Sequence, residues 1–445
     1  MIDTKISKLG DHIRKINQRF SELTNGERLS VYGVTNKEGV VNTGVPPSDD
    51  LSNYIVVGEK QFVYNPYRVN VGSIGLTPKG FLGLVSPAYV VFETKEDLDP
   101  EFLFLYLKSE RGNNLINHYG NRGGVRDALR FDALTEIDIP ITDLPTQKEI
   151  LARLQSLQAL HREANEIFTR LKTDVKRLRQ STLQQAIQGK LVDYNPAPGE
   201  KTGAELLADI RAEKERRARE LGKKPEAPLP PVTPEEMPFE LPEGWVWCRL
   251  GDLTYQITDG THQTPTYTKN GRIFLSAQNV KPFRFLPEKH QFVSEQDYIN
   301  YINNRKPEFE DVLIARVGAG IGETAVIDRQ IEFAFYVSLG LIKPIKTYLN
   351  PYFLMTIFNG PYGVKYSKGS IRSHGASAGN FNLERIRAFP IPLPTISVQE
   401  QILSRLKYQI TKCDNLEQQI SILQTKVERL WRSELQQTFK FETNG

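Results

Sequence analysis

The sequence predicts an α+β protein in which two similar mixed α/β globular domains are joined by two long antiparallel coiled-coil helices, with pseudo-twofold symmetry. The main observation is a duplication. Residues 139–187 recur as residues 391–439 at a constant offset of 252, with 16 identities over 49 positions and no gap. Each copy carries an apolar heptad repeat, and each follows a stretch of short, β-rich runs. We therefore expect a globular domain followed by a long helix, and then the same plan again.

The duplicated segments have the spacing of a coiled-coil seam, with apolar residues at alternating intervals of four and three. Pro and Gly are absent from residues 147–188 and 399–440. Each copy can therefore form one unbroken helix about 60 Å long. Such a helix buries its seam only against a partner, and two copies that leave equivalent domains at the same point would pair antiparallel. The predicted seam residues are Ile150, Leu154, Leu157, Leu171, Leu178, Ile402, Leu406, Leu416, Leu423 and Leu430.

The two copies divide the chain into five segments. The connector between the halves predicts a charged, solvated helix at residues 204–221. Seven prolines in the 18 residues from 225 to 242 predict a semi-rigid extended linker. The predicted segments are a first globular domain (1–142), a first long helix (143–192), the connector (193–241), a second globular domain (242–394) and a second long helix (395–445).

The two globular domains share anchor motifs, and their sequences differ in the segments between these motifs. Leu250-Gly251-Asp252 repeats Leu9-Gly10-Asp11, and an Asn-Pro or Asp-Pro pair opens a predicted helix in each domain. Between such anchors the sequences diverge almost completely, which predicts one frame with different contents. In the first domain we expect strands at residues 54–57, 61–64, 88–92 and 137–141, and a helix at residues 100–107.

The composition indicates a chain with real hydrophobic cores and little excess charge. It has 445 residues, 39% of them hydrophobic, and a formal net charge of +4, which permits a nucleic-acid partner without requiring one. The two cysteines show no metal-ligand spacing and are consistent with a reducing compartment. No run approaches the length of a membrane span, and we expect a cytoplasmic protein.

The sequence offers no complete catalytic motif. Residues 317–322 resemble a dinucleotide-binding loop, but Glu323 replaces the last Gly and no βαβ pattern follows. A phosphate-binding P-loop and a Cys/His cluster with zinc spacing are both missing. Asp259 and His262 lack a third group or a nucleophile. We therefore expect no catalytic residue, metal or cofactor in this chain.

Polar and basic loop residues form the candidate binding set. Arg, Asn and Gln offer the forked hydrogen bonds that distinguish base pairs, whereas Ser, Thr and Lys hold phosphates. Each one alone is better explained as an ordinary loop side chain, but their grouping in two differing domains on one frame favours binding. The candidates are Asn65, Tyr67, Arg68, Ser73, Lys79, Arg122, Arg126, Thr258, Thr261, His262, Gln263, Gln278, Asn279, Arg316, Arg372, Ser373 and His374.

Several motifs resemble those of the specificity subunit of type I restriction–modification systems, and their order spans nearly the whole chain. The first half matches less fully, because no Pro-Glu-Gly-Trp precedes Leu9 and its closing Pro-x-Leu-Pro is interrupted. The matching motifs of the second half are residues 239–245 (Phe-Glu-Leu-Pro-Glu-Gly-Trp) with 250–252, residues 259–262, residues 318–322, and residues 390–394 (Pro-Ile-Pro-Leu-Pro) with Gln399.

The resemblance implies a non-catalytic subunit that gives a restriction–modification complex its DNA specificity. Each globular domain would be a target recognition domain that reads one half of a bipartite site on double-stranded DNA, and the paired helices would set the spacing. Two methyltransferase (modification) subunits would dock largely on the helices and use S-adenosylmethionine to methylate adenine. Restriction and translocase subunits, with ATP and Mg²⁺, would join the same complex.

The residues alone leave two other classes of function open. A coiled-coil scaffold that binds only protein partners predicts no sequence-selective DNA binding. An enzyme acting alone predicts methylation or cleavage by the isolated chain, and the missing catalytic motifs disfavour it.

Overall fold

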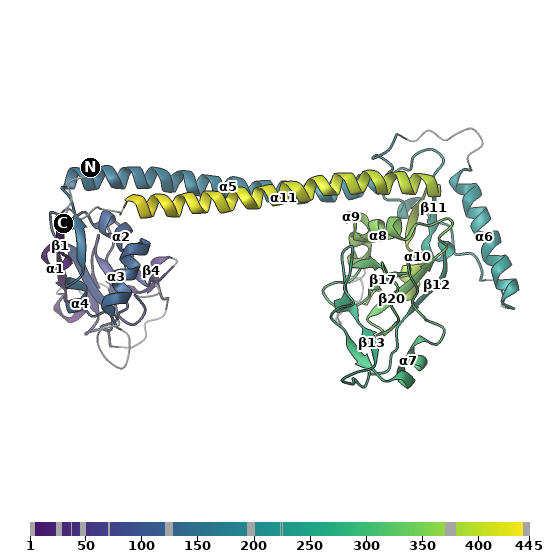
Figure 1. The fold of residues 1–445 in the computed structure, drawn as a ribbon, viewed down its shortest axis with the longest axis horizontal. Coiled ribbons are helices and arrows are strands. Elements are labelled where there is room, and N and C mark those ends of the chain that lie inside the picture. The colour runs from purple at the N-terminus through teal and green to yellow at the C-terminus, as the bar shows by residue number, and fades with distance from the viewer. Residues whose placement is uncertain are drawn as a thin grey trace. The chain divides into compact units, whose positions relative to one another are not determined.

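The computed structural model describes residues 5–23, 29–36, 38–44, 50–69, 72–120, 128–193, 201–222, 224, 226–369 and 380–438. It divides into two compact units, residues 1–170 with 420–445 and residues 171–419. Both long helices contribute to both units, so each unit holds one globular domain and one pair of helix segments (Figure 1).

Two four-stranded sheets form the globular domain of the first unit, with the orders β2-β9-β6-β7 and β4-β3-β8-β5. The first sheet packs against helices, and its core includes Phe62 and Phe92, whose ring centroids lie 4.6 Å apart. The strands are β2 (Ile13–Ile16), β3 (Val31–Thr35), β4 (Gly39–Asn42), β5 (Ile55–Val57), β6 (Phe62–Tyr64), β7 (Ile74–Leu76), β8 (Gly83–Val85) and β9 (Val90–Thr94). The helices are α1 (Leu9–His12), α2 (Pro100–Lys108), α3 (Glu110–Gly120) and α4 (Phe131–Thr135).

The second unit repeats this plan with different additions. Its sheet β12-β20-β17-β18 is antiparallel throughout, as is β2-β9-β6-β7. In the sheet β16-β13-β19 the central strand pairs antiparallel on one side and parallel on the other, as β3 does. The strands are β12 (Thr254–Asp259), β13 (Arg272–Leu275), β14 (Val280–Lys281), β15 (Arg284–Phe285), β16 (Gln291–Val293), β17 (Val312–Ala315), β18 (Thr324–Val326), β19 (Phe333–Phe335) and β20 (Leu339–Pro344). The helices are α7 (Glu295–Ile302), α8 (Pro351–Asn359), α9 (Pro361–Gly369) and α10 (Leu383–Ala388).

An antiparallel strand pair closes each globular domain directly before its long helix. Helix α5 begins at Leu144, before the predicted Pro-free stretch, because Pro145 falls in the first turn, where Pro is tolerated. The two sets are β1 (Lys5–Lys8), β10 (Asp138–Ile141) and α5 (Leu144–Ile187) in the first half, and β11 (Val246–Arg249), β21 (Pro390–Leu393) and α11 (Ile396–Thr438) in the second.

Positions separated by the offset of 252 occupy equivalent places in the two units. The Leu9 N–H donates to the Ile137 carbonyl at 2.8 Å, and the Leu250 N–H donates to the Phe389 carbonyl at 2.9 Å. Phe389 is the duplicate of Ile137. The duplicated sequence is therefore also a duplicated junction between the globular domain and the long helix.

One buried glutamine locks α5 to its globular domain. Gln147 is fully buried, and its Nε2 donates to the carbonyls of Thr142 and Asp97 at 2.7 and 3.0 Å. Its Oε1 accepts the N–H of Asp99 at 2.8 Å. Asp99 is the N-cap of α2, so this side chain joins the start of the long helix to the start of a short one.

The duplicate glutamine makes the same three bonds in the second unit. Gln399 is fully buried and donates to the carbonyls of Pro394 and Tyr348 at 3.1 and 2.8 Å. Its Oε1 accepts the N–H of Asn350, the N-cap of α8, at 2.8 Å. The identity of Gln147 and Gln399 in the sequence therefore reflects a shared junction and not a shared binding role.

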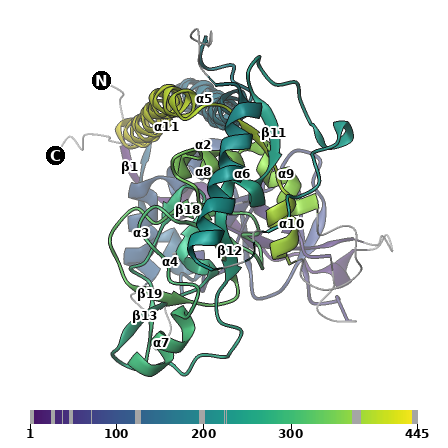
Figure 2. The ribbon, with the colours of Figure 1, turned by 90° about the vertical axis from the view of Figure 1, so that its right-hand side faces the viewer.

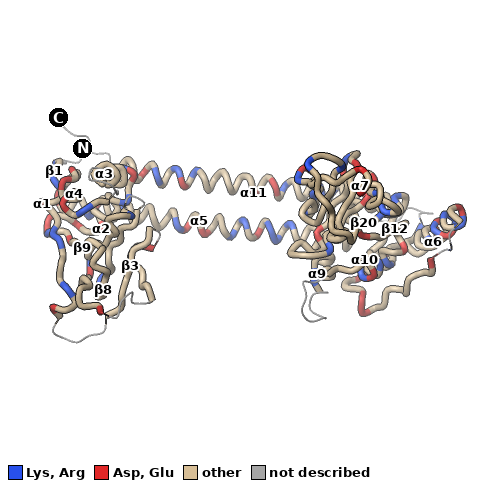
Figure 3. Tube along the Cα trace, turned by 90° about the horizontal axis from the view of Figure 1, so that it is seen from below, with Lys and Arg blue, Asp and Glu red and all other residues tan. Residues whose placement is uncertain are grey.

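Within each unit the two long helices lie side by side and antiparallel (Figure 1). In the first unit Arg153 pairs with Glu434, and His161 pairs with Glu428, both at 3.0 Å. The residue number falls along α11 as it rises along α5, which antiparallel pairing requires. Figure 3 shows basic and acidic residues distributed along both helices.

The helix seam is closed on one side only, which corrects the expectation of a fully buried heptad seam. Phe168 and Val175 are buried in the middle part of α5, and Cys413 and Ile420 are buried in the middle part of α11. Ile150, Leu154, Ile402 and Leu406 are buried next to the globular domains, and Leu157 is half-buried. The remaining predicted seam residues are exposed, namely Leu171 (42%), Leu178 (50%), Leu416 (42%), Leu423 (50%) and Leu430 (65%).

Polar pairs close the opposite flank of the seam, which explains the one-sided packing. In the second unit Arg179 lies 2.7 Å from Asp414 and 3.3 Å from Glu417. In the first unit the His161 ring stacks on Trp431, with centroids 5.4 Å apart. These side chains contact each other across that flank, whereas the leucines on the other flank are exposed.

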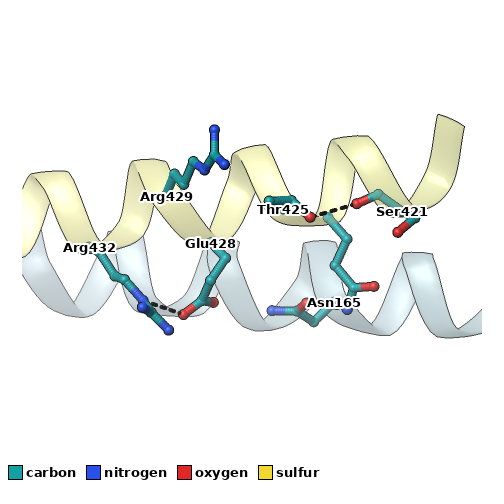
Figure 4. A pocket seen from close by; sticks show the side chains of 7 residues that line it. Asn165, Ser421, Thr425, Glu428, Arg429 and Arg432 are labelled. Carbon is teal, nitrogen blue, oxygen red and sulfur yellow. Dashed lines mark hydrogen bonds and ion pairs between the residues drawn. The ribbon is translucent and has the colours of Figure 1, made fainter. Parts of the chain in front are cut away.

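A polar cleft of about 410 Å³ lies on the polar flank in the first unit (Figure 4). Asn165 lines it from α5, and Glu428 and Arg432 line it from α11, paired with each other at 3.0 Å. The hydrogen bond from Arg432, aided by the one from His161, lowers the pKa of Glu428. Glu428 is therefore already bonded to two partners, Arg432 and His161. The contacts within the helix pair explain why this cleft is polar.

Helix α6 (Gly203–Glu220) packs on the globular domain of the second unit (Figure 2). Ile210 is fully buried, and the Arg217 guanidinium lies 3.7 Å from the centroid of the Tyr255 ring. Lys214 donates to the Gly251 carbonyl at 2.7 Å. The outer face of the helix carries ion pairs among its own charges, as the sequence pattern predicts.

The Pro-rich linker is held against the same domain by one arginine. The Arg249 side chain is 9% exposed and donates to the carbonyls of Pro230 and Pro231, both at 3.0 Å. It also pairs with Glu236 at 2.6 Å, and this hydrogen bond lowers the pKa of Glu236 to about 2. The linker is therefore a fixed part of the second unit.

Candidate nucleic-acid interface

In the second unit the predicted binding loops meet at one end of the sheet β12-β20-β17-β18. The loop after β12 begins at Asp259, and the loop after β17 begins at Arg316. An added Cβ at Gly260 would lie 2.1 Å from the Phe335 carbonyl oxygen, so glycine alone allows the first loop to lie this close to β19. β12 and β17 both pair antiparallel with β20, so they finish at the same end of the sheet. The polar loops that follow them therefore lie together.

Arg316 anchors these loops and does not present its side chain to solvent, which corrects its assignment as a DNA contact. It is 5% exposed and forms an ion pair with the Asp259 carboxylate. Its guanidinium also donates to the carbonyls of Val337 and Phe381, each at 3.1 Å. A buried guanidinium needs such a full set of acceptors, and here they come from three separate segments.

Two further candidates, Thr261 and Asn279, are also internal. Thr261 is 5% exposed, and its backbone pairs with Phe335 and Val337. Asn279 is 1% exposed and donates to the carbonyls of Leu286 and Lys289 at 2.9 and 2.6 Å. Their polar groups are satisfied within the domain, so their role is to shape the loops.

The candidates that reach solvent around these anchors form a small polar group. His262, Gln263 and Gln278 are exposed, and Thr258 is half-buried. His262 lies 3.2 Å from the Asp259 carboxylate, which Arg316 already holds. The exposed amides and imidazole supply both donors and acceptors for base edges.

The first unit has a corresponding loop between β6 and β7. Asn65 accepts the Tyr67 N–H at 3.0 Å and donates its own N–H to the Ser73 carbonyl at 3.3 Å. Tyr67 and Arg68 project from this turn, with Tyr67 59% exposed. Ser73 is 6% exposed and serves the turn through its backbone, which corrects its assignment as a phosphate contact.

Lys79 does not join this loop, which corrects the grouping expected from the sequence. It lies in the turn after β7, where the Thr77 N–H bonds to the Gln61 carbonyl at 2.9 Å. Because β6 and β7 are antiparallel, that turn lies at the opposite end of the strand pair from Tyr67. Lys108 supports the loop instead, donating to the Gly72 carbonyl at 2.5 Å, and burial lowers its pKa.

Arg122, Arg126, Arg372, Ser373 and His374 lie outside the described residues. The residues that follow these two basic segments occupy equivalent places. The Leu129 N–H donates to the Pro66 carbonyl at 3.0 Å, and the Phe381 N–H donates to the Arg316 carbonyl at 2.8 Å. Leu129 and Phe381 differ by the same offset of 252. Leu129 and Phe381 therefore each lie beside the loop described above in their own unit.

The sequence reasoning missed the hairpin β14–β15, whose tip lies beside the loop between β17 and β18. Its Phe283 is 39% exposed, and the Phe283 N–H donates to the Thr324 carbonyl at 3.1 Å. Lys281 pairs with Glu323 at 3.3 Å. The available signal was Lys281-Pro282-Phe283-Arg284, a Pro-containing turn with a cation on each side.

Within the described ranges, no group of three or more His, Cys, Asp or Glu side chains is arranged to hold a metal ion. None of the described helices combines the length and the apolar character that crossing a bilayer would require.

Two domains on one repeated frame, with different loops at corresponding sheet ends and paired long helices, define a class of two-domain recognition proteins. The chain belongs to the family of the type I restriction modification DNA specificity domain, whose family model matches residues 3–170 and 242–424. The family does not support the alternative of a scaffold that binds only proteins.

Individual relatives agree with this family. The chain is 27% identical over 306 residues to the EcoAI type I restriction enzyme specificity subunit of Escherichia coli and 26% identical over 318 residues to the EcoEI specificity subunit. These alignments cover 65% and 67% of this chain but only 50% and 52% of the relatives, so the chain spans about half the length of the relatives it matches.

Solved structures share the whole fold. A chain from a structural study of type I restriction–modification assembly and conformational transition matches with a TM-score of 0.65 at 18% identity, covering 99% of this chain and 98% of that one. The HsdS subunit from Thermoanaerobacter tengcongensis matches with a TM-score of 0.57 at 18% identity, covering 98% and 96%.

Proposed function

We propose that this chain is the non-catalytic DNA-specificity subunit of a type I restriction–modification complex, and that each globular domain reads one half of a bipartite site. The observation that carries the proposal is the contrast between a duplicated frame and different loops at equivalent sheet ends. Two readers of different sequences need the same mounting and different contact residues. The proposed domains are residues 1–142 and 242–394, and the segments 143–192, 193–241 and 395–445 connect them.

The exposed loop residues supply suitable chemistry for this reading. His262, Gln263 and Gln278 can hydrogen-bond base edges in the second domain, and Arg68 and Tyr67 can contact bases or phosphates in the first. We place Arg122, Arg126, Arg372, Ser373 and His374 in the same role from their composition. Phosphate contacts by these cations make the affinity strongly dependent on salt concentration.

We assign the spacing between the half-sites, and the docking of two modification subunits, to the paired helices. The leucines on the open flank support the docking, because exposed apolar side chains along a helix mark protein interfaces. In the first unit these include Leu160 (61%), Ile167 (42%), Leu423 and Leu430, and in the second Leu171, Leu178 and Leu416. S-adenosylmethionine, ATP and Mg²⁺ then belong to the modification and restriction subunits, and the complex acts on cytoplasmic DNA.

The test is to express the chain with a modification subunit in cells and to map the methylated adenines. We expect methylation at one split sequence, with two specified parts separated by a fixed number of unspecified base pairs. Exchanging residues 242–394 for the corresponding domain of another such subunit should change one specified part and leave the other. If both parts stay the same after the exchange, the globular domains do not read the DNA. Methylation by the chain alone would show instead that it is an enzyme.

A further inference from the structure

The tip of the hairpin β14–β15 adopts a turn that its sequence disfavours. Val280 pairs with Phe285 and Lys281 pairs with Arg284, which leaves Pro282 and Phe283 as a two-residue turn. Phe283 has φ of 63°, in the left-handed region that bulky side chains avoid. With Pro before it, this position normally holds Gly or Asn. Among the described non-glycine residues with positive φ, Phe283 is the only aromatic one.

The surrounding structure forces this conformation. Val280 is fully buried and Phe285 is 4% exposed, and both belong to a core cluster with Leu313 and Phe333. Asn279 bonds to the two carbonyls that follow the hairpin, and its own carbonyl accepts the Leu286 N–H at 2.8 Å. The hairpin is therefore rigid at its base and pinned at its tip through the bond from Phe283 to Thr324.

A strained residue that the fold holds in place is a sign of function when its side chain gains little from folding. Phe283 still exposes 39% of its surface, so core packing does not explain why Gly is absent. The flanking Lys281 and Arg284 are exposed cations, and Arg284 forms no ion pair with any described residue. An aromatic tip between two cations suits a nucleic acid, whose bases offer stacking faces next to phosphates.

We propose that Phe283 is a wedge that inserts between stacked bases of the bound half-site, while Lys281 and Arg284 hold the phosphates on either side. This inference rests on the proposed DNA-reading function. It places one specific apolar contact beside the polar loops that begin at Asp259 and Arg316. Because Phe283 inserts at a base step, the affinity for the half-site bound by the second domain also depends on how easily that step unstacks. This form of sequence specificity needs no hydrogen bond.

The experiment uses the full chain with its modification subunit and DNA of the mapped target. Three variants are compared: Phe283→Ala removes the ring, Phe283→Gly removes the ring and the strain, and Phe309→Ala is the control. Phe309 belongs to the same domain and is 38% exposed. It precedes β17, whereas the hairpin tip bonds to Thr324, the first residue of β18. Because β17 and β18 are antiparallel, these two positions lie at opposite ends of the strand pair. 2-Aminopurine placed singly along the second half-site reports unstacking by a rise in fluorescence.

We expect both Phe283 variants to bind about tenfold more weakly than wild type, and Phe309→Ala to bind as wild type. The Gly variant should melt above the Ala variant, because Gly adopts this φ without steric cost. The fluorescence rise should appear at one base step with wild type and Phe309→Ala and vanish with both Phe283 variants. Equal affinity of Phe283→Ala and Phe309→Ala overturns the wedge, as does a wild-type complex that unstacks no step. Failure of the wild-type complex to prefer the mapped site would instead overturn the proposed function.

Discussion

The two globular domains are most alike where they touch the long helices and least alike where their loops project. Gln147 and Gln399 make the same three hydrogen bonds, and the strand pairs β1–β10 and β11–β21 close both domains in the same way. By contrast, the loop after β6 is a compact asparagine turn, whereas the loop after β17 is organised by a buried arginine. The difference teaches that the attachment to the long helices and the structure of the projecting loops are separable properties of this fold.

The largest effect is expected from changing the frame itself. Four residues inserted after Arg170 advance α5 by about 6 Å and rotate the following helix by about 40°. The seam then loses its phase, and we expect lost assembly or altered half-site spacing, measured by mapping methylated adenines. As a control, seven residues inserted in both helices, after Arg170 and Ile422, keep the phase and should lengthen the spacer by about three base pairs. If the half-site spacing and the activity both stayed unchanged, the helices would not set the spacing.

The next effect contrasts the two loop anchors. Arg316→Met removes the buried guanidinium and leaves the half-buried Asp259 carboxylate with only the exposed His262 beside it, which should destabilise the second unit by roughly 3–5 kcal/mol. Asn65→Ala removes a neutral turn bond in the first unit and should cost about 1 kcal/mol. Denaturant unfolding followed by tryptophan fluorescence reports mainly the second unit, since Trp245 and Trp247 lie there and Trp431 lies in the first. Arg329→Met, which removes an exposed cation, is the control. Equal costs at the two anchors would contradict the comparison.

The shared junction predicts two equal effects. Gln147→Leu and Gln399→Leu each leave one backbone N–H and two carbonyls without their partner, at a cost of roughly 3 kcal/mol. Because the two sites belong to different units and share no bonding partner, the costs in the double variant should add. Denaturant unfolding with a probe in each unit measures them, and Gln180→Leu on the exposed face of α5 is the control. If the substitution at either site left the free energy of unfolding unchanged, the two junctions would differ in their contribution to stability despite their duplicated sequence.

The smallest effect concerns the Pro-rich linker of the second unit. Glu236 has a pKa of about 2 in the folded chain against an ordinary value of 4.5. Its contribution to stability is therefore present above about pH 4.5 and is lost as the pH falls towards 2. Because the carboxylate is 40% exposed, we expect Glu236→Gln to cost about 1 kcal/mol at pH 7. Thermal unfolding of wild type and variant should differ at pH 7 and converge near pH 2. A difference that persists at pH 2 would point to lost packing instead of lost charge.

The sequence predicted the frame well because the frame is repeated. Sixteen identities at one offset located both junctions, and the heptad repeat located both helices. It could not predict which flank of the seam stays open. That depends on Arg179 meeting Asp414 and Glu417, residues far away in the sequence, and leucines at equal heptad spacing look alike before such pairs are known.

The candidate site was predicted as a region but not residue by residue. Arg316 and Gln278 are both polar residues at strand ends, yet one is buried and the other is exposed. Only the contact with Asp259, 57 positions away, distinguishes the buried anchor Arg316 from an exposed loop residue. Phe283 escaped notice because an aromatic residue next to Pro suggests a strand or core position, and its positive φ is visible only in three dimensions.

The pairing of β1 with β10 and of β11 with β21 has a consequence for how a globular domain is joined to the rest of the chain. Lys5 lies opposite Ile141, and Val246 lies opposite Leu393, so the chain comes into and leaves each globular domain at neighbouring points. Residues paired across an antiparallel ladder are only about 5 Å apart. The second globular domain is therefore, in topological terms, an insertion between the linker and α11. We expect that it can be exchanged without disturbing the rest of the chain, provided that the two closing strands are retained.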